Sequence, residues 1–367
     1  MIVLTQFRNK PLLFKKPISI IAASDSASLK ACFAEMERAL ESGYYLAGFL
    51  SYEAGYIFEP CLEQKRNYDF PLCYMGVYRS PEHSLPQPAT SCNSATLTNL
   101  RLNISQERYF ANIAAIRDYI ARGDVYQITY CIKFLFDFFG SSWDLYCSLL
   151  KEQPVPYPAY IETAAFNILS LSPEKFLKKS SGSIVTKPMK GTWPRGGTFV
   201  SDLIERMRFG RDEKNRAENV MIADLLRNDL GRVGHHVRAP RLFEVRGYKT
   251  LFQMTSTVTA SLPEGILLYQ LFSALFPSGS VTGAPKIRAM EIIRQLEMEE
   301  RRIYTGAIGY VTPRKDLFFN IPIRTLLIRS GQGEMGVGGG IVWDSTARGE
   351  WNEGLLKARF VTDYAKK

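Results

Sequence analysis

The sequence has few residues that bind transition metals. Its three histidines and six cysteines form neither a His-x-x-x-His nor a Cys-x-x-Cys pair. A zinc site is therefore not expected, and any metal ion would need carboxylate ligands. Irregularly spaced cysteines are typical of reduced thiols in a cytosolic protein, so we expect no disulfide bonds and a cytoplasmic location.

The sequence also lacks an apolar run that approaches the roughly 20 residues of a membrane span. Its first residues, MIVLTQFRNKPLLFKK, do not have the order of a secretory signal. The longest apolar candidate, residues 266–276, is interrupted by Tyr269, Gln270 and Ser273, so we interpret it as a buried helix. We therefore expect no interaction with a membrane.

Nucleotide-binding motifs are missing as well. No strand-like run leads into a Gly-x-Gly-x-x-Gly helix start, and no Walker motif occurs, so neither a Rossmann nor a P-loop site is expected. The 46 basic and 36 acidic residues leave a net charge of +10. Because the basic residues are scattered rather than gathered with aromatics, we expect no nucleic acid. This charge suits a small dianionic substrate or an ordinary solvated surface.

The 367 residues, 46% of them apolar, are enough to form a large core. Residues 81–96, rich in Pro and Ser, indicate a linker between an N-terminal subdomain of residues 1–80 and a catalytic domain of residues 97–367. We interpret GYYLAGFLSYEAGY and PLCYMGVY as buried strands that join the larger unit. There, helical stretches alternate with runs such as AAFNILSLS, GAIGYV and LFFNIPIRTLLI, which favours a mixed α/β or α+β fold.

A carboxylate occurs within an apolar helical pattern. Residues 212–230 have helical periodicity, and Glu218 shares one face with Met221, Ile222 and Leu225. A carboxylate on a core-facing stripe is costly unless it is paired or binds a metal ion. The alternative to a metal site is a buried ion pair with an arginine.

Two more glutamates, Glu350 and Glu353, lie three residues apart on one face of another expected helix. Acidic residues also occur in first helical turns because they interact favourably with the helix dipole. Together with Glu218, however, they could form the oxygen-ligand set that Mg2+ prefers.

Lys190 lies in an extended stretch, KPMKGTWPR, with a proline on either side. A lysine that points inward here would have a lowered pKa and could act as a nucleophile. The alternative is an ordinary lysine that faces water.

Three further features could bind an anion. The segment SGSVTGAPKIRAM, which contains Gly283, leads into a helix whose free backbone amides could hold a carboxylate, although an ordinary capped helix would have the same pattern. Arg324 interrupts a strand-like apolar run, and a substrate carboxylate would pair with it, unless it is an edge-strand arginine. The glycines 338–340 allow close approach of a ligand to the backbone, unless they form a flexible turn.

Seven segments, in order along residues 105–364, resemble the chorismate-utilising enzymes, which include anthranilate, aminodeoxychorismate, isochorismate and salicylate synthases. They are SPEKF, PMKGTWPRG, RAENVMIADLLRNDLGRV, FPSGSVTGAPKIRAMEII, YTGAIGY, IPIRT, and GGGIVWDS followed by EWNE. Seven ordered motifs are far more specific than any one of them. The resemblance implies an α+β, anthranilate-synthase-like fold, with two packed antiparallel sheets, outer helices and an active site between the layers.

The resemblance also implies which reaction the chain catalyses. At the positions where this chain has PMKGT, the typical sequence of anthranilate synthases looks like Pro-Ile-Ala-Gly-Thr. Lysine at the position of Lys190 is the mark of aminodeoxychorismate synthases. The expected product is 4-amino-4-deoxychorismate, for p-aminobenzoate and folate synthesis. No glutaminase or lyase segment is recognisable, so a separate glutamine amidotransferase subunit would supply ammonia and a separate aminodeoxychorismate lyase would act downstream.

Site roles follow from the same resemblance. Lys190 would attack C2 of chorismate and Glu174 would protonate the departing 4-hydroxyl, while Mg2+ would be held by the three glutamates. The substrate would be bound by these residues: Arg324, Tyr304, Thr192, Gly283, Gly338, Gly339 and Gly340. Gln253 replaces a histidine frequent in relatives, and Trp193 replaces an arginine, so the roles of those two residues are not transferred.

Two alternatives stay open at this point. The first is anthranilate, isochorismate or salicylate synthase chemistry on the same scaffold. The second is a non-catalytic binding subunit that positions a partner.

Overall fold

The computed structural model describes residues 1–7, 10–83, 95–247 and 251–366. Within them, the strands form two antiparallel sheets, which establishes the α+β fold. The first sheet has the order β15 (Gly283–Ala284), β7 (Gln127–Phe139), β19 (Gln332–Ile341), β18 (Thr325–Arg329), β9 (Asn167–Ser172), β8 (Tyr157–Glu162), β1 (Ile2–Phe7), β2 (Lys10–Phe14), with β6 (Thr96–Leu102) paired to β7.

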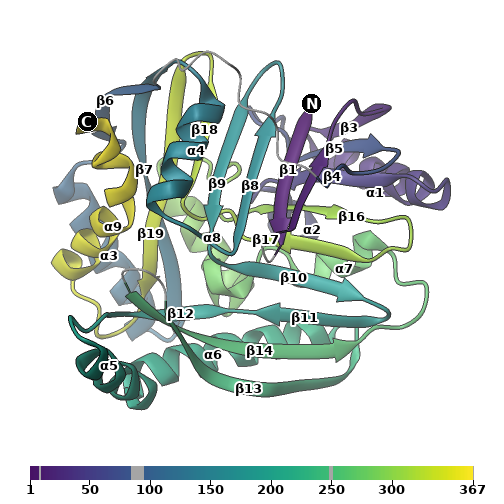
Figure 1. The fold of residues 1–367 in the computed structure, drawn as a ribbon. Helices are drawn as coiled ribbons and strands as arrows, with labels where there is room; N and C mark the ends of the chain where they lie inside the picture. Colours follow the sequence, from purple (N-terminus) through teal and green to yellow (C-terminus); the bar gives the residue numbers. More distant parts are fainter. Residues whose placement is uncertain (8–9, 84–94, 248–250, 367) are drawn as a thin grey trace.

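The strands of the second sheet run across those of the first (Figure 1). Its order is β12 (Met189–Pro194), β14 (Leu251–Ser261), β11 (Ser183–Lys187), β10 (Lys175–Ser180), β17 (Leu317–Asn320), β16 (Ala307–Val311), β4 (Tyr45–Leu50), β5 (Cys73–Tyr78), β3 (Ser19–Ala23), with β13 (His235–Gly247) paired to β14.

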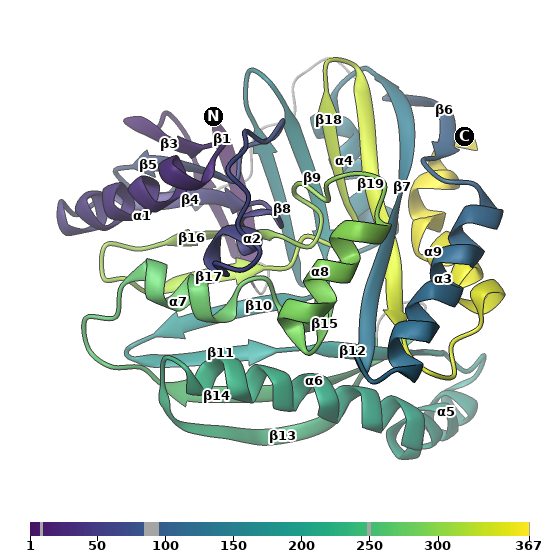
Figure 2. The same ribbon diagram turned by 180° about the vertical axis from the view of Figure 1, so that it is seen from behind.

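Helices cover the outer faces of both sheets (Figure 2). Those on the first sheet are α3 (Gln106–Ala121), α4 (Ser142–Glu152), α8 (Lys286–Leu296) and α9 (Ala347–Thr362). Those on the second are α1 (Ser26–Glu41), α2 (Ala54–Phe58), α5 (Phe199–Arg211), α6 (Glu213–Gly231) and α7 (Leu268–Leu275). Short 3-10 helices follow at Gly279–Val281 and Tyr364–Lys366.

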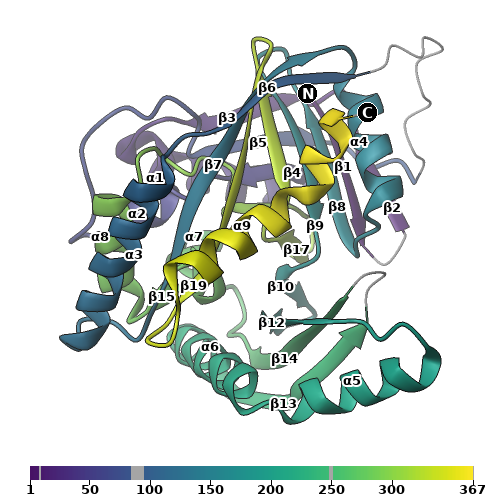
Figure 3. The ribbon, with the colours of Figure 1, turned by 90° about the vertical axis from the view of Figure 1, so that its left-hand side faces the viewer.

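Each sheet has its own helix-facing core, and a third apolar cluster joins the two sheets. In that cluster Val3 and Phe14 of the first sheet pack with Phe49 and Ile308 of the second. The aromatic rings of Phe49 and Phe70 stack with centroids 5.4 Å apart. Burial of these apolar side chains holds the two sheets together at one end. The sheets diverge toward the end where β12 and β19 lie (Figure 3).

The first 80 residues contribute strands to both sheets: β1 pairs with β8 of the first, and β4 pairs with β16 of the second. Most of the expected linker, residues 84–94, lies outside the described residues. The division at residues 81–96 therefore stays a prediction.

Two sequence interpretations need correction. In GYYLAGFLSYEAGY only Tyr45–Leu50 is a strand, since Ala54–Phe58 is helical. LFFNIPIRTLLI contains two strands in different sheets, β17 and β18, because the chain crosses between the layers at residues 321–324. The buried helix expected in residues 266–276 is confirmed as α7.

No helix among the described residues is long and apolar enough to cross a membrane. The five cysteines in the described ranges are free thiols, and the sixth, Cys92, lies outside them.

Candidate active site

A cavity of about 1060 Å³ opens where the two sheets diverge. Its walls come from β12 of the second sheet, β19 of the first, α6 and α9 (Figure 3). Eleven of the twelve residues to which the sequence assigned roles line it; they are Glu174, Lys190, Thr192, Glu218, Tyr304, Arg324, Gly338, Gly339, Gly340, Glu350 and Glu353. Gly283 does not line it.

Lys190 is brought into the cavity by an irregularity in β12. The register with β14 shifts between Lys190 and Thr192, and Gly191 between them has φ +76°. A side chain at Gly191 would overlap the amide of Asn215, so only glycine fits this bulge. The Nζ atom of Lys190 lies 3.2 Å from the position that a Cβ on Gly340 would occupy.

Burial and nearby carboxylates act on the pKa of Lys190 in opposite directions. Burial lowers the pKa of the Lys190 ammonium, and the nearby Glu218 and Glu174 carboxylates oppose that shift only in part. An inward-facing lysine is thus present, as one of the two sequence interpretations anticipated.

Glu174 lies in the turn between β9 and β10 and is buried. Ser280 Oγ donates a hydrogen bond to Glu174 Oε1 over 2.7 Å. Burial raises the pKa of the Glu174 carboxyl to about 7, although the Ser280 hydrogen bond and the charge of Lys190 act in the opposite direction. A carboxyl with this pKa can hold a proton near neutral pH and release it during a reaction.

Three carboxylates face the same cavity from two helices. Glu218 comes from the second turn of α6, and Glu350 and Glu353 come from the start of α9. Burial raises the pKa of Glu218 and of Glu350, and each carboxylate also feels the negative charge of Glu353. Ser345 Oγ donates to Glu350 Oε1 over 2.7 Å, and Lys357 Nζ pairs with Glu353 Oε1 at 2.7 Å.

The expected core stripe of α6 is displaced by one position. The buried residues of the helix are Asn219, Ile222, Ala223, Leu226, Asp229 and Leu230. Glu218 lies beside this stripe, is half-buried and lines the cavity. The predicted helix of residues 212–230 is otherwise confirmed, because α6 spans Glu213–Gly231. Asp212 caps its start by accepting a hydrogen bond from the backbone N–H of Asn215.

The glycines 338–340 belong to β19, paired with residues 129–131 of β7, and so do not form a flexible turn. A Cβ on Gly339 would lie 3.0 Å from Glu350 Oε2, and one on Gly338 would overlap the carbonyl of Tyr130. Their lack of side chains therefore leaves the strand backbone open to the cavity. Lys357 Nζ donates to the Gly338 carbonyl over 2.8 Å.

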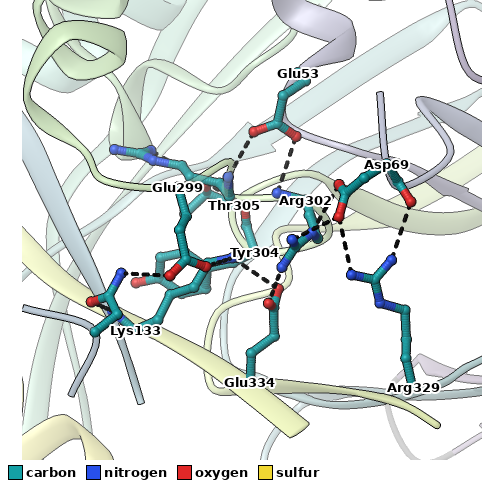
Figure 4. A network of polar contacts seen from close by, with 11 residues as sticks. Glu53, Asp69, Lys133, Glu299, Arg302, Tyr304, Thr305, Arg329 and Glu334 are labelled. Carbon is teal, nitrogen blue, oxygen red and sulfur yellow. Dashed lines mark hydrogen bonds and ion pairs between the residues drawn. The ribbon is translucent and has the colours of Figure 1, made fainter. Parts of the chain in front are cut away.

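Tyr304 and Thr305 enter the cavity from a loop that a polar network holds in place (Figure 4). In this network the buried Glu53 accepts the backbone N–H groups of Arg301 and Arg302 over 2.7 and 3.0 Å. Arg302 also pairs with Asp69 at 2.8 Å. Because Glu53 and Asp69 belong to the first 80 residues, that segment supports one wall of the cavity.

The remaining candidate residues occupy different positions. Arg324 lines the cavity just before β18 with φ +52°, so it is not an edge-strand residue. Thr192 is exposed at the cavity rim. Gly283 instead pairs with Ile128 in the first sheet, where a Cβ would overlap the carbonyl of Gln127. Gly283 therefore lies outside the cavity lining, and a role in substrate binding at this residue stays a prediction.

Sequence reasoning overlooked several cavity residues that carry polar groups. Thr129, Lys214, Ser280 and Lys357 line the cavity. Ser280 and Lys214 belong to segments that the sequence analysis considered, but no pattern singled out these side chains. Thr129 Oγ1 is buried without a hydrogen-bond partner among the described residues, and so is Oε1 of Gln253. Buried polar atoms without partners at a cavity are available to a ligand.

The fold and the site together define a class of protein. The chain belongs to the chorismate binding enzyme family, which it matches over residues 8–363. It is 40% identical over 270 residues to aminodeoxychorismate synthase component 1 of Klebsiella aerogenes, covering 73% of this chain and 60% of the relative. It is 36% identical over 263 residues to anthranilate synthase component 1 of Aquifex aeolicus, covering 71% and 53%.

A solved structure shares the fold. Anthranilate synthase component I from Streptococcus pneumoniae superposes with a TM-score of 0.80 at 23% identity, covering 98% of this chain and 89% of that one. The aligned part of this chain spans 60% of the length of the Klebsiella aerogenes relative and 54% of the aminodeoxychorismate synthase component 1 of Bacillus subtilis.

Proposed function

We propose that the chain converts chorismate and ammonia to 4-amino-4-deoxychorismate, as component I of an aminodeoxychorismate synthase. The observation that carries the proposal is the half-buried Lys190, whose amine shares one cavity with the Glu174 and Glu218 carboxylates. The relative named aminodeoxychorismate synthase component 1, at 40% identity, supports the same assignment.

Lys190 and Glu174 would perform the chemical steps. The neutral amine of Lys190 forms a bond to C2 of chorismate, and the C4–O bond breaks as Glu174 donates its proton to give water. Ammonia then bonds to C4 and returns one proton to the Glu174 carboxylate, while the C2–N bond breaks and releases Lys190 as the neutral amine. The pKa of Glu174, raised to about 7 by burial, keeps this proton available near neutral pH.

The enolpyruvyl carboxylate of chorismate would be bound by groups of the cavity other than the three glutamates. Arg324, the Tyr304 hydroxyl and the amides of Gly338–Gly340 would hold the enolpyruvyl carboxylate, because they supply positive charge and hydrogen-bond donors. Gln253 and Thr129, whose buried oxygen atoms have no partner among the described residues, are further candidates for hydrogen bonds to the substrate.

We further propose that Glu218, Glu350 and Glu353 hold Mg2+. The three carboxylates supply the oxygen donors that this ion prefers, and all of them face the cavity. In this structure, however, no three carboxylate, histidine or cysteine side chains of the described residues are grouped closely enough to hold a metal ion, and Glu353 is paired with Lys357. When bound, Mg2+ would offset the negative charge of the ring carboxylate beside these glutamates.

A separate glutamine amidotransferase subunit and a separate aminodeoxychorismate lyase are proposed as partners. The name component 1 of the relatives supports a partner subunit. The cytoplasmic location likewise stays a prediction.

The product formed from chorismate, Mg2+ and ammonium tests the proposed function. We expect 4-amino-4-deoxychorismate by mass spectrometry, and p-aminobenzoate once a lyase is added. Anthranilate, isochorismate or salicylate as the product would assign the chain to another branch of the family. Absence of any turnover by the folded chain would favour the non-catalytic binding subunit.

A further inference from the structure

Helix α5 carries an apolar stripe that faces solvent. Its members are Phe199, Val200, Leu203, Ile204 and Met207, with exposed fractions of 86, 65, 49, 40 and 50%. These residues repeat at intervals of about four and so share one side of the helix. A side of this composition normally packs against the protein's own core.

The opposite side of α5 is fixed to the second sheet by polar contacts. Asp202 pairs with Arg195 at 2.5 Å, and Glu205 accepts the indole N–H of Trp193 over 2.8 Å. The one buried apolar residue of the helix is Phe209, whose ring stacks on Trp193 with centroids 5.5 Å apart. Because these contacts turn the carboxylates inward, α5 cannot bury its apolar stripe without losing them.

The stripe lies beside the cavity. Trp193 and Pro194, which precede α5, line the cavity, and so do Lys214 and Asn215, which follow it. Figure 3 shows α5 at the margin of the second sheet, next to β13 and the start of α6. A protein that covers α5 would therefore also face the rim of the cavity.

The stripe has a basic border. Arg206, Arg208, Arg211, Lys214 and Arg216 are exposed, whereas Glu213 is the only exposed acid in the fully described range 199–216. The matching surface would be apolar at its centre and acidic at its edge, because complementary charges favour association.

We propose that α5 is the docking surface for a second protein chain with such a surface. The inference rests on the proposed function, under which the second chain is the glutamine amidotransferase subunit that delivers ammonia at the cavity rim. A 13-residue helix is about 20 Å long, and a few apolar anchors of this kind contribute most of the affinity in many interfaces.

The test uses the double variant Leu203→Asp, Met207→Asp and the glutamine amidotransferase subunit encoded in the same genome. Isothermal titration calorimetry should show binding at least about 30-fold weaker than that of the unmodified chain, as expected when interface anchors are replaced by charges. Glutamine-dependent product formation at low partner concentration should fall in parallel. Ammonium-dependent formation should not change, because neither residue lines the cavity.

A matched control is Phe139→Asp, which alters a residue that is 63% exposed at the end of β7 in the other sheet. It should bind the partner normally. A thermal melt establishes that the double variant is folded, and Leu203→Gln, Met207→Gln replaces it if the melt shows unfolding.

Unchanged partner binding by the folded variant would overturn the docking proposal. The docking proposal would also be overturned if the unmodified chain self-associates in sedimentation experiments, or binds vesicles of anionic phospholipid, and the double variant abolishes that self-association or vesicle binding. Failure of the proposed function would be seen differently, as an absence of ammonium-dependent turnover in the unmodified chain, while binding measured by calorimetry would still report on α5.

Discussion

Substitution of Ser280 should move the pH dependence of the reaction in a defined direction. Ser280 Oγ donates to Glu174 Oε1 over 2.7 Å, and this hydrogen bond stabilises the ionised carboxylate and so lowers the pKa of Glu174. Ser280→Ala removes the bond and should raise that pKa. Because the proposed general acid must be protonated, activity should fall above pH of about 7 in the unmodified chain and persist to higher pH in the variant.

The size of the shift follows from the hydrogen bond. A hydrogen bond to a charged group contributes about 1.5–3 kcal/mol, and about 1.36 kcal/mol corresponds to one pKa unit. Water that enters the cavity would replace part of the lost bond, so we expect a shift of about one unit.

The assay is kcat/KM for chorismate against pH, with free ammonia held constant. Ser170→Ala is the matched control, since this buried serine accepts from Thr325 at 2.8 Å and does not line the cavity. A basic limb at the same pH in Ser280→Ala and the unmodified chain would refute the assignment of Glu174 as the acid.

Three further predictions concern the nucleophile, the metal ion and the supporting network. Lys190→Ala should lose most 4-amino-4-deoxychorismate formation. The unmodified chain, incubated with chorismate in the absence of ammonia and then quenched, should show an adduct on Lys190 by peptide mass spectrometry. An unchanged rate and product in the variant would contradict the assignment of Lys190 as the nucleophile. Excess EDTA and Glu218→Gln should each remove most activity, and full activity in EDTA would exclude the metal ion. Glu53→Ala should lower the free energy of unfolding by about 2–3 kcal/mol in urea titrations, because two buried N–H groups lose their acceptor. The control Glu82→Ala, which removes an exposed ion pair, should change the free energy of unfolding by less than about 1 kcal/mol. Equal effects of the two substitutions would contradict the structural role of Glu53.

Much of the site could be predicted because its residues lie in ordered motifs. The motifs that contain Lys190, Glu218 and Glu350 were read in separate segments, and the structure brings all three to one cavity. Helical periodicity placed α6 within one residue of its bounds. It did not place Glu218 correctly within the helix, since a hydrophobic pattern cannot distinguish a residue on the core stripe from one beside it that faces a cavity.

Other features depend on contacts between distant segments. Gly283 follows a pattern that permits an anion site, but it pairs with β7 and does not line the cavity. The bulge that turns Lys190 inward requires Asn215 of α6 to lie against Gly191. The support of Tyr304 by Glu53 joins residues about 250 positions apart, as the contact from Glu53 to Arg301 spans 248. No local pattern reports such contacts.

Helix α5 also shows that a local sequence pattern does not report tertiary contacts. The spacing of Phe199, Leu203 and Met207 indicates one apolar face, as it does for helices that pack on a core. Periodicity states which residues share a face, but the direction of that face is set by what the other side binds. Here Arg195 and Trp193 hold the polar side inward, and both belong to the segment that begins with the cavity strand β12. The contacts of Trp193 and Arg195 with α5 therefore also leave its apolar stripe exposed. Lys190 lies on strand β12 and the proposed docking surface lies on α5, the helix that follows this strand.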